Sequence, residues 1–164
     1  MTTVAAPHPI ITPEALAEMY AHARRDYPNE CCGIVFGPRD DRTASRALAC
    51  LNIQNELHAE DPSRHTRDAR TAYNLGAGDL FKLQKSLRGA EPAKVVYHSH
   101  VDVGAYFSDT DQAAAQMDGE ATYPVEYVVI DVRADGCREA AQFAWDAAAR
   151  KYVEVGRYAG LPPA

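Results

Sequence analysis

The segment Ala93 to Asp111, AKVVYHSHVDVGAYFSDTD, constrains the fold of this chain more than any other stretch. Its first half is apolar and rich in β-branched residues, which predicts a strand over AKVVYHSH. Because side chains alternate along a strand, His98 and His100 project from the same face. Ser108 and Asp111 have the spacing of a helix N-cap and its first turn. The fold must therefore bring the end of a strand beside the start of a helix, where two imidazoles and a carboxylate can converge.

The rest of the pattern predicts an α/β domain with a mixed central β-sheet flanked by helices. Helices are predicted over 13–26, after a Thr-Pro-Glu start, and from a cap at Asp79 to about Gly89. The polar segment Glu56–Arg70 is predicted to be a long loop, of a kind that often carries function. Further strands are expected over CCGIVFG, RALACLNIQN, TAYNL and VEYVVIDV, with REAAQFAWD and KYVEVG as a closing hairpin. Since no internal repeat or linker interrupts the pattern, residues 1–164 are expected to form one domain.

Composition narrows the function classes. A net charge of −6 without a lysine or arginine run argues against general binding to nucleic acid or to an anionic membrane. No apolar run approaches the roughly 20 residues that span a bilayer, and the N-terminus lacks the pattern of a secretory signal. The four cysteines include no Cys-x-x-Cys pair, so reduced, buried thiols of a cytoplasmic protein are expected rather than disulfides or a zinc knuckle.

The converging side chains have the chemistry of a catalytic metal site. Two neutral imidazoles and one carboxylate, from His98, His100 and Asp111, leave the fourth position of a tetrahedral zinc ion open for water. Glu30, just before the CCGIVFG strand, is the carboxylate best placed to act as general base, and Ser108 could donate to an oxyanion. Each feature also has an ordinary interpretation: Ser-x-x-Asp is a common capping box, and a glutamate beside a strand is usually solvated. A cap and a ligand are compatible, because the cap fixes the geometry that a ligand needs.

Other His-x-His metal motifs fit less well. A metallo-β-lactamase-like site requires a histidine where Val103 stands, and a cupin-type iron site requires a further histidine on a later strand. The sequence His58-Ala-Glu60 matches the first half of a zinc deaminase motif, but no cysteine pair follows it. The other histidines are expected at the surface or in loops: His8, His22, His58 and His65.

With these residues in place, the segments NECCGIVFG, VVYHSHVDVGAYFSDTD and YVVIDV resemble the JAMM, or MPN-type, zinc metalloprotease family over most of the chain. That family's pattern is an upstream glutamate, then His-x-His, seven residues, Ser, two residues and Asp. The resemblance implies one zinc ion per chain, held by His98, His100 and Asp111. It also implies Glu30 as the acid/base residue and Ser108 as support for the tetrahedral intermediate. The fold it implies is the MPN, cytidine-deaminase-like α-β-α architecture.

The short chain and the residues of the histidine segment, HSH followed by DVGAYFS, resemble the bacterial branch of that family. Its members are associated with ubiquitin-like sulfur-carrier proteins and cleave after a C-terminal Gly-Gly, so such a carrier is the expected partner. Tyr73, Tyr106 and Phe107 are candidate contacts to the tail or carrier. Val101 and Phe107 replace prolines that eukaryotic relatives usually carry, a departure that bears on the substrate type more than on metal binding.

Several alternatives stay open at this point. The same metal chemistry would serve an isopeptidase or a small-peptide hydrolase, and the sequence does not say whether the leaving group is an amino acid or a lysine side chain. A non-catalytic MPN-type scaffold is a third alternative, but such scaffolds typically lack one or more of the five motif residues, and all five are present here. Family members often self-associate, which makes a homodimer a candidate state.

Overall fold

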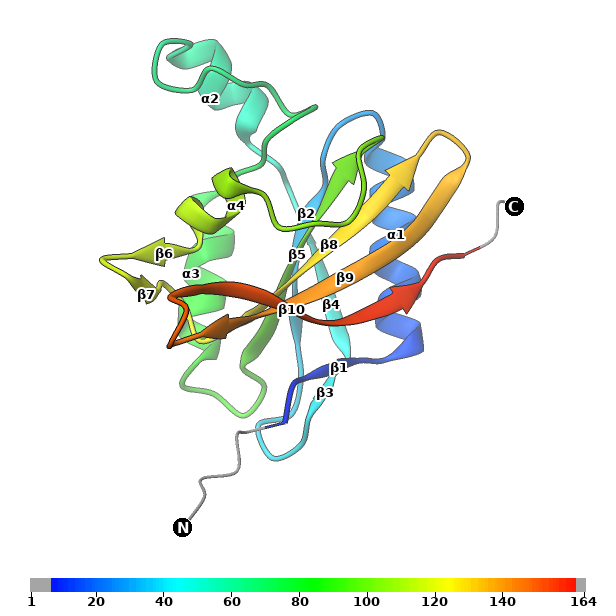
Figure 1. Ribbon diagram of the computed structural model, residues 1–164, viewed down its shortest axis with the longest axis vertical. Helices are drawn as coiled ribbons and strands as arrows, with labels where there is room; N and C mark the ends of the chain where they lie inside the picture. Colours follow the sequence, from blue (N-terminus) through cyan, green and yellow to red (C-terminus); the bar gives the residue numbers. More distant parts are fainter. Residues whose placement is uncertain (1–6, 162–164) are drawn as a thin grey trace.

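A six-stranded mixed sheet forms the centre of the computed structural model, which describes residues 7–161 (Figure 1). Its strands lie in the order β10-β9-β8-β5-β2-β4. β5 and β8 pair in parallel, whereas the other neighbours pair antiparallel. The predicted α/β class with a mixed central sheet is thus confirmed. The strands are β2 (Cys32–Phe36), β4 (Arg46–Cys50), β5 (Ala93–Val101), β8 (Glu126–Arg133), β9 (Gly136–Asp146) and β10 (Lys151–Ala159).

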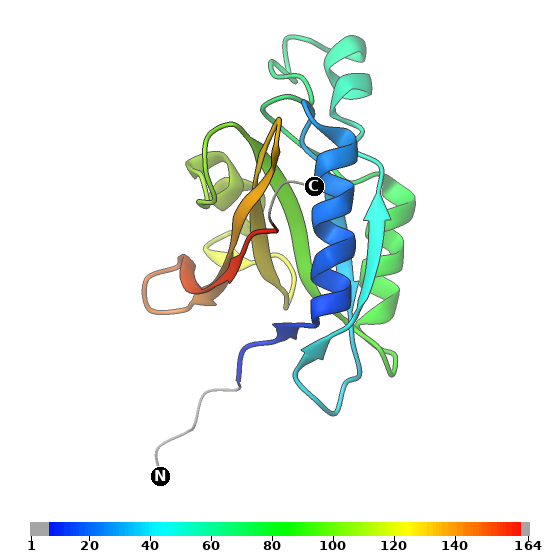
Figure 2. The same ribbon diagram turned by 90° about the vertical axis from the view of Figure 1, so that its right-hand side faces the viewer.

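Helices cover both faces of this sheet. α1 (Pro13–Asp26) packs on one face, and α3 (Ala77–Ser86) and α4 (Asp109–Ala114) lie on the other, as the two perpendicular views show (Figures 1 and 2). α2 (Gln54–Glu60) lies beyond one end of the sheet (Figure 1). Four two-residue strands complete the fold: β1 (Ile10–Ile11), β3 (Thr43–Ala44), β6 (Gln116–Met117) and β7 (Glu120–Ala121). Within residues 7–161, no helix is long and apolar enough to cross a membrane.

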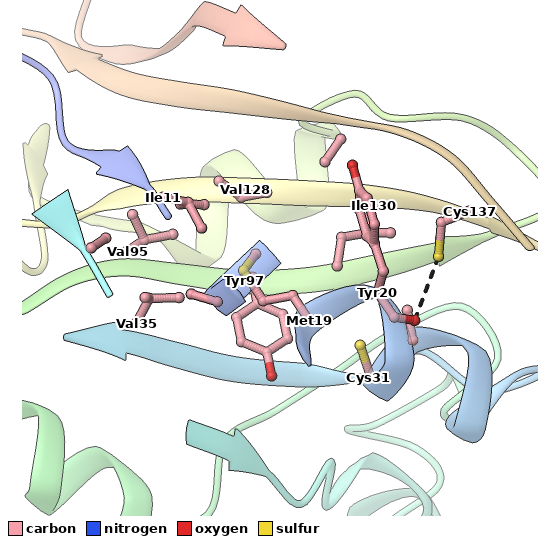
Figure 3. Close-up of a cluster of buried hydrophobic side chains, with 14 of the residues drawn as sticks. Ile11, Met19, Tyr20, Cys31, Val35, Val95, Tyr97, Val128, Ile130 and Cys137 are labelled. Atoms are coloured by element: carbon pink, nitrogen blue, oxygen red, sulfur yellow. Dashed lines mark hydrogen bonds between the residues drawn. The ribbon is translucent and has the colours of Figure 1, made fainter. Parts of the chain in front are cut away.

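Alternation along β5 divides its side chains between two cores. Val95 and Tyr97 point toward α1, where they pack with Met19 and Tyr20 (Figure 3). The intervening residues face the opposite side, where Val96 belongs to the core beneath α3. His98 and His100 continue this second set. The histidines therefore lie on the α3/α4 face, at the end of a strand with neighbours on both edges.

Three local predictions were wrong. Part of the segment predicted as a loop, Glu56–Arg70, is helix α2, whose polar sequence carries no apolar stripe to indicate a helix. The TAYNL segment contributes only an isolated bridge between Leu75 and Asn52. The N-cap of α3 is Gly76, and Asp79 lies in the first turn.

A fourth correction concerns His22, which is buried on the inner face of α1 rather than exposed. Its Nδ1 lies 2.8 Å from the Tyr97 hydroxyl and its Nε2 lies 3.1 Å from the Asp26 carboxylate. A histidine with two polar partners can be buried at little penalty, which the sequence pattern alone does not reveal.

All four cysteines are buried and free of disulfides, as predicted. Burial raises the pKa of Cys31 and of Cys50 to about 12. These thiols therefore stay protonated at neutral pH and pack as small apolar side chains.

Gly33 permits the close packing of β2 on β5. It lies opposite Tyr97 in the strand register, and a Cβ atom at this position would overlap the Tyr97 ring. We expect Gly33→Ala to lower the free energy of unfolding by about 1 to 3 kcal/mol, because the ring and its partner His22 are packed too tightly to shift.

Urea denaturation measures this effect, and Gly78→Ala is the matched control. Gly78 lies in α3, where an added Cβ meets no atom within 4 Å. Alanine there should be neutral or stabilise by about 0.5 to 1 kcal/mol. Equal stability of the Gly33→Ala variant and the wild type would show that the Tyr97 ring is free to move.

Candidate metal centre and active site

β5 holds the two predicted histidine ligands side by side. The Nε2 atoms of His98 and His100 lie 3.2 Å apart, and both side chains are buried. β2 and β8 pair with β5 on either edge. The backbone beneath the imidazoles is therefore fixed along its length.

The start of α4 brings the predicted carboxylate to the same point. Ser108 caps the helix, and its Oγ accepts the Asp111 N–H at 3.1 Å. The Ser108 N–H in turn donates to Asp111 Oδ2 at 3.0 Å. That same oxygen lies 3.2 Å from Nε2 of His98 and 3.2 Å from Nε2 of His100. The capping box and the ligand placement thus coexist, because the cap orients the carboxylate toward the imidazoles.

The three donor atoms fit a zinc ion. They form a triangle with edges of 3.2 Å. A tetrahedron with this edge has its centre about 2.0 Å from each corner, which is the usual Zn–N and Zn–O distance. Within residues 7–161, this is the one group of three His, Cys, Asp or Glu side chains placed closely enough to share an ion.

The tautomer of His100 also suits a metal ligand. Its Nδ1–H donates to the Gly104 carbonyl at 3.1 Å, which leaves a lone pair on Nε2. His98 is oriented differently: its ring stacks on Tyr73 at 4.3 Å between centroids, and its buried Nδ1 has no hydrogen-bond partner among the described residues. On its Nδ1 side, the His98 ring is therefore fixed by packing rather than by a hydrogen bond.

The site's electrostatics favour the ligand forms of His98 and Asp111. Burial lowers the pKa of His98 and more than offsets the attraction of Asp111, which favours the neutral imidazole. Burial also raises the pKa of Asp111, but His98, His100 and the Ser108 N–H together hold it below its ordinary value. Neutral imidazoles and an ionised carboxylate are the forms that bind zinc.

Glu30 lies beside this group, two residues before β2 begins. Its N–H donates to the Ala69 carbonyl at 2.7 Å, and its side chain is buried. Burial and the nearby Asp111 raise the pKa of Glu30 to about 8, against the opposing effect of Arg67. A cleft of about 350 Å³ is lined by Glu30 together with His100, Ser108 and Asp111. In the metal-free protein, this carboxyl is therefore poised to exchange a proton near neutral pH.

The three aromatic residues suggested as substrate contacts occupy different positions. Tyr73 lines the cleft and supports His98. Tyr106 is 49% exposed, and its ring meets that of His100 edge-on at 4.8 Å. Phe107 is partly buried and serves in packing against the core. Its ring contacts those of Tyr127, Phe143 and Tyr152.

The cleft also contains residues of the polar segment Glu56–Arg70, which was expected to carry function but none of whose residues was individually assigned to the site. One wall comes from the segment after α2 and includes Arg64, His65 and Arg67, while the buried side chain of Gln54 lies behind it. The signal in the sequence was the concentration of cationic side chains in SRHTRDAR. It gave no hint that the segment folds back on Glu30.

Comparison with known proteins gives a consistent assignment. Residues 12–147 match the profile of the family described as prokaryotic homologs of the JAB domain. Proteins named CysO-cysteine peptidase from Mycobacterium tuberculosis and Mycobacterium bovis are 30% identical over 126 residues, which cover 76% of this chain and 73% of theirs.

Two structures determined in solution share the fold. A Desulfitobacterium hafniense protein has a TM-score of 0.59 with 21% identity, over 88% of each chain. A Salinibacter ruber protein has a TM-score of 0.56 with 24% identity, over 89% of this chain and 88% of that one.

The raised pKa of Glu30 predicts a pH-dependent stability of the chelator-treated protein. A carboxyl whose pKa rises from 4.5 to about 8 on folding stabilises the fold below pH 4.5, and this contribution is lost as the pH rises through 8. We expect Glu30→Gln to unfold near the wild-type temperature at pH 5 and at a higher temperature than the wild type at pH 9. At pH 9 its free energy of unfolding should exceed that of the wild type by a few kcal/mol.

Thermal melts across pH 5 to 9 measure this difference. Glu56→Gln, at an exposed position of α2, is the matched control and should follow the wild type at every pH. If the offset between Glu30→Gln and wild type is constant with pH, then Glu30 does not titrate in this range.

Proposed function

Because the chain belongs to the family of prokaryotic homologs of the JAB domain, we propose that it is a zinc-dependent peptidase acting on a ubiquitin-like sulfur-carrier protein. The bond cleaved is the amide that follows the carrier's C-terminal Gly-Gly. The observation that carries this proposal is the convergence of three donor atoms at 3.2 Å spacing, beside a cleft that is also lined by a buried glutamic acid. The name of the mycobacterial relatives supports the substrate class.

His98, His100 and Asp111 would hold the ion. When bound, zinc supplies Lewis acidity, which lowers the pKa of water and polarises the substrate carbonyl. The Ser108 N–H keeps Asp111 Oδ2 oriented, and the Gly104 carbonyl keeps His100 in the required tautomer.

Glu30 moves the proton. Its carboxylate removes a proton from the attacking water and then delivers it to the departing amine, so that it acts first as base and then as acid. Burial favours the protonated form that the second step needs. The Ser108 hydroxyl contributes at the carbonyl oxygen: its lone pair accepts the Asp111 N–H, and its proton is available for the negative charge that develops there.

The substrate class suits the cleft. A Gly-Gly tail has no side chains, so it can enter a space of about 350 Å³ and reach buried donor atoms. A carrier that transfers sulfur, together with four buried, unpaired cysteines in this chain, suits a reducing, cytoplasmic location.

Glu30→Gln should retain zinc and lose at least about a hundredfold in turnover, because the amide is nearly isosteric but transfers no proton. The assay incubates Gly-Gly-tailed carriers, extended at the C-terminus, with enzyme and follows the loss of the added residue by intact mass. Near wild-type turnover by this variant would refute the role of Glu30. Absence of cleavage of any carrier by zinc-loaded wild type would refute the carrier substrate.

Asp111→Asn should lose bound zinc, because a neutral amide replaces the one anionic donor of the site. Elemental analysis of protein purified without chelators measures zinc per chain. Asp109→Asn is the matched control, since this residue is exposed in the same helical turn, and it should keep one ion per chain. Wild-type protein without zinc would favour the non-catalytic scaffold instead.

A further inference from the structure

Two arginines line the cleft without an acidic partner among residues 7–161. Arg64 and Arg67 both line the space that contains Glu30 and Asp111, and both are exposed. No ion pair joins either guanidinium to an acidic side chain within residues 7–161. Exposed, unpaired cations at the wall of a reaction cleft are suited to binding an anionic part of a substrate.

The backbone around Arg67 is fixed relative to Glu30. The buried side chain of Gln54 donates to the Arg67 carbonyl at 2.8 Å. Two residues further on, the Ala69 carbonyl accepts the Glu30 N–H at 2.7 Å, and the Ala69 N–H donates to Asn55 Oδ1 at 2.8 Å. The segment is therefore tied directly to the peptide that carries the proposed acid/base residue.

Arg67 and Glu30 also line the same cleft. This proximity matters for the leaving group. Glu30 delivers a proton to the departing nitrogen, and in an α-amino acid the carboxylate carbon lies only about 2.5 Å from that nitrogen. A cation beside the proton donor is thus in reach of the α-carboxylate. A lysine side chain as leaving group places no carboxylate there.

We propose that Arg67, with Arg64 in the same cleft, binds the free α-carboxylate of the residue that the enzyme releases. This inference rests on the proposed peptidase function and makes it specific: the enzyme removes a single C-terminal amino acid from the carrier and discriminates against isopeptide-linked or C-terminally blocked substrates. The guanidinium fork matches a carboxylate in two parallel hydrogen bonds.

The test compares two substrates that differ in one functional group. The carrier cleaved fastest in the mass assay is extended after Gly-Gly by one alanine, either as the free acid or as the carboxamide. We expect wild-type enzyme to prefer the acid by about ten- to a hundredfold in kcat/KM, the range of a hydrogen bond to a charged group. Arg67→Gln should raise KM for the acid much more than for the amide, and so reduce the preference to about threefold or less.

Matched variants separate this role from a general effect of charge. Arg70→Gln removes the same charge three residues away, outside the cleft lining, and should retain the full preference for the acid. Arg67→Lys should restore part of it, because charge is kept but the fork is lost.

Failure of this inference differs from failure of the function on which it rests. Equal cleavage of acid and amide by wild type overturns the inference alone. So does a preference that survives both in Arg67→Gln and in the Arg64→Gln, Arg67→Gln double variant. Cleavage of neither substrate by zinc-loaded wild type overturns the peptidase proposal and the inference with it.

Discussion

The placement of one oxygen atom, Asp111 Oδ2, determines the geometry of the site. It accepts the Ser108 N–H and faces the Nε2 atoms of both histidines at 3.2 Å. Three lone pairs that point toward one centre repel one another unless a proton or a cation lies between them. The arrangement persists because its supports are rigid: β5 pairs on both edges, and the carboxylate is held by a reciprocal helix cap.

The residue between the two histidines links this centre to the proposed acid/base group. Ser99 points to the α1 side of the sheet, where its Oγ accepts the Cys31 N–H at 2.7 Å, and its own N–H donates to the Cys31 carbonyl at 3.1 Å. Cys31 directly follows Glu30. β5 therefore presents the imidazoles on one face of the sheet and holds Cys31, the neighbour of Glu30, from the other face. The distance between the histidines and the Glu30 carboxyl thus depends on the hydrogen bonds that join β5 to Cys31.

Sequence periodicity was a good guide wherever one physical signal dominated. The continuous β-branched runs in AKVVYHSH and VEYVVIDV reflect burial of the central strands on both faces. The two-residue spacing of the histidines placed them on a common side of the sheet. The Ser-x-x-Asp spacing likewise predicted the helix start that orients Asp111. The polar segment after β4 was less predictable. Its helix has no apolar stripe, and its shape depends on side-chain to backbone hydrogen bonds from Asn52 and Gln54, which leave no periodic pattern.

The groups around the cleft are supported in two different ways. The proposed ligands and the acid/base residue lie on or beside β5, α4 and β2, where regular backbone hydrogen bonds hold them, whereas Arg64 and Arg67 lie on a segment held by a few polar side chains. Substitutions in that segment can alter which substrate end is accepted without disturbing the donor triangle. The tie between Ala69 and Glu30 limits this freedom, because any movement of the segment also moves the proton donor. In the proposed enzyme, selectivity for the leaving group and proton delivery would therefore be coupled through this backbone hydrogen bond.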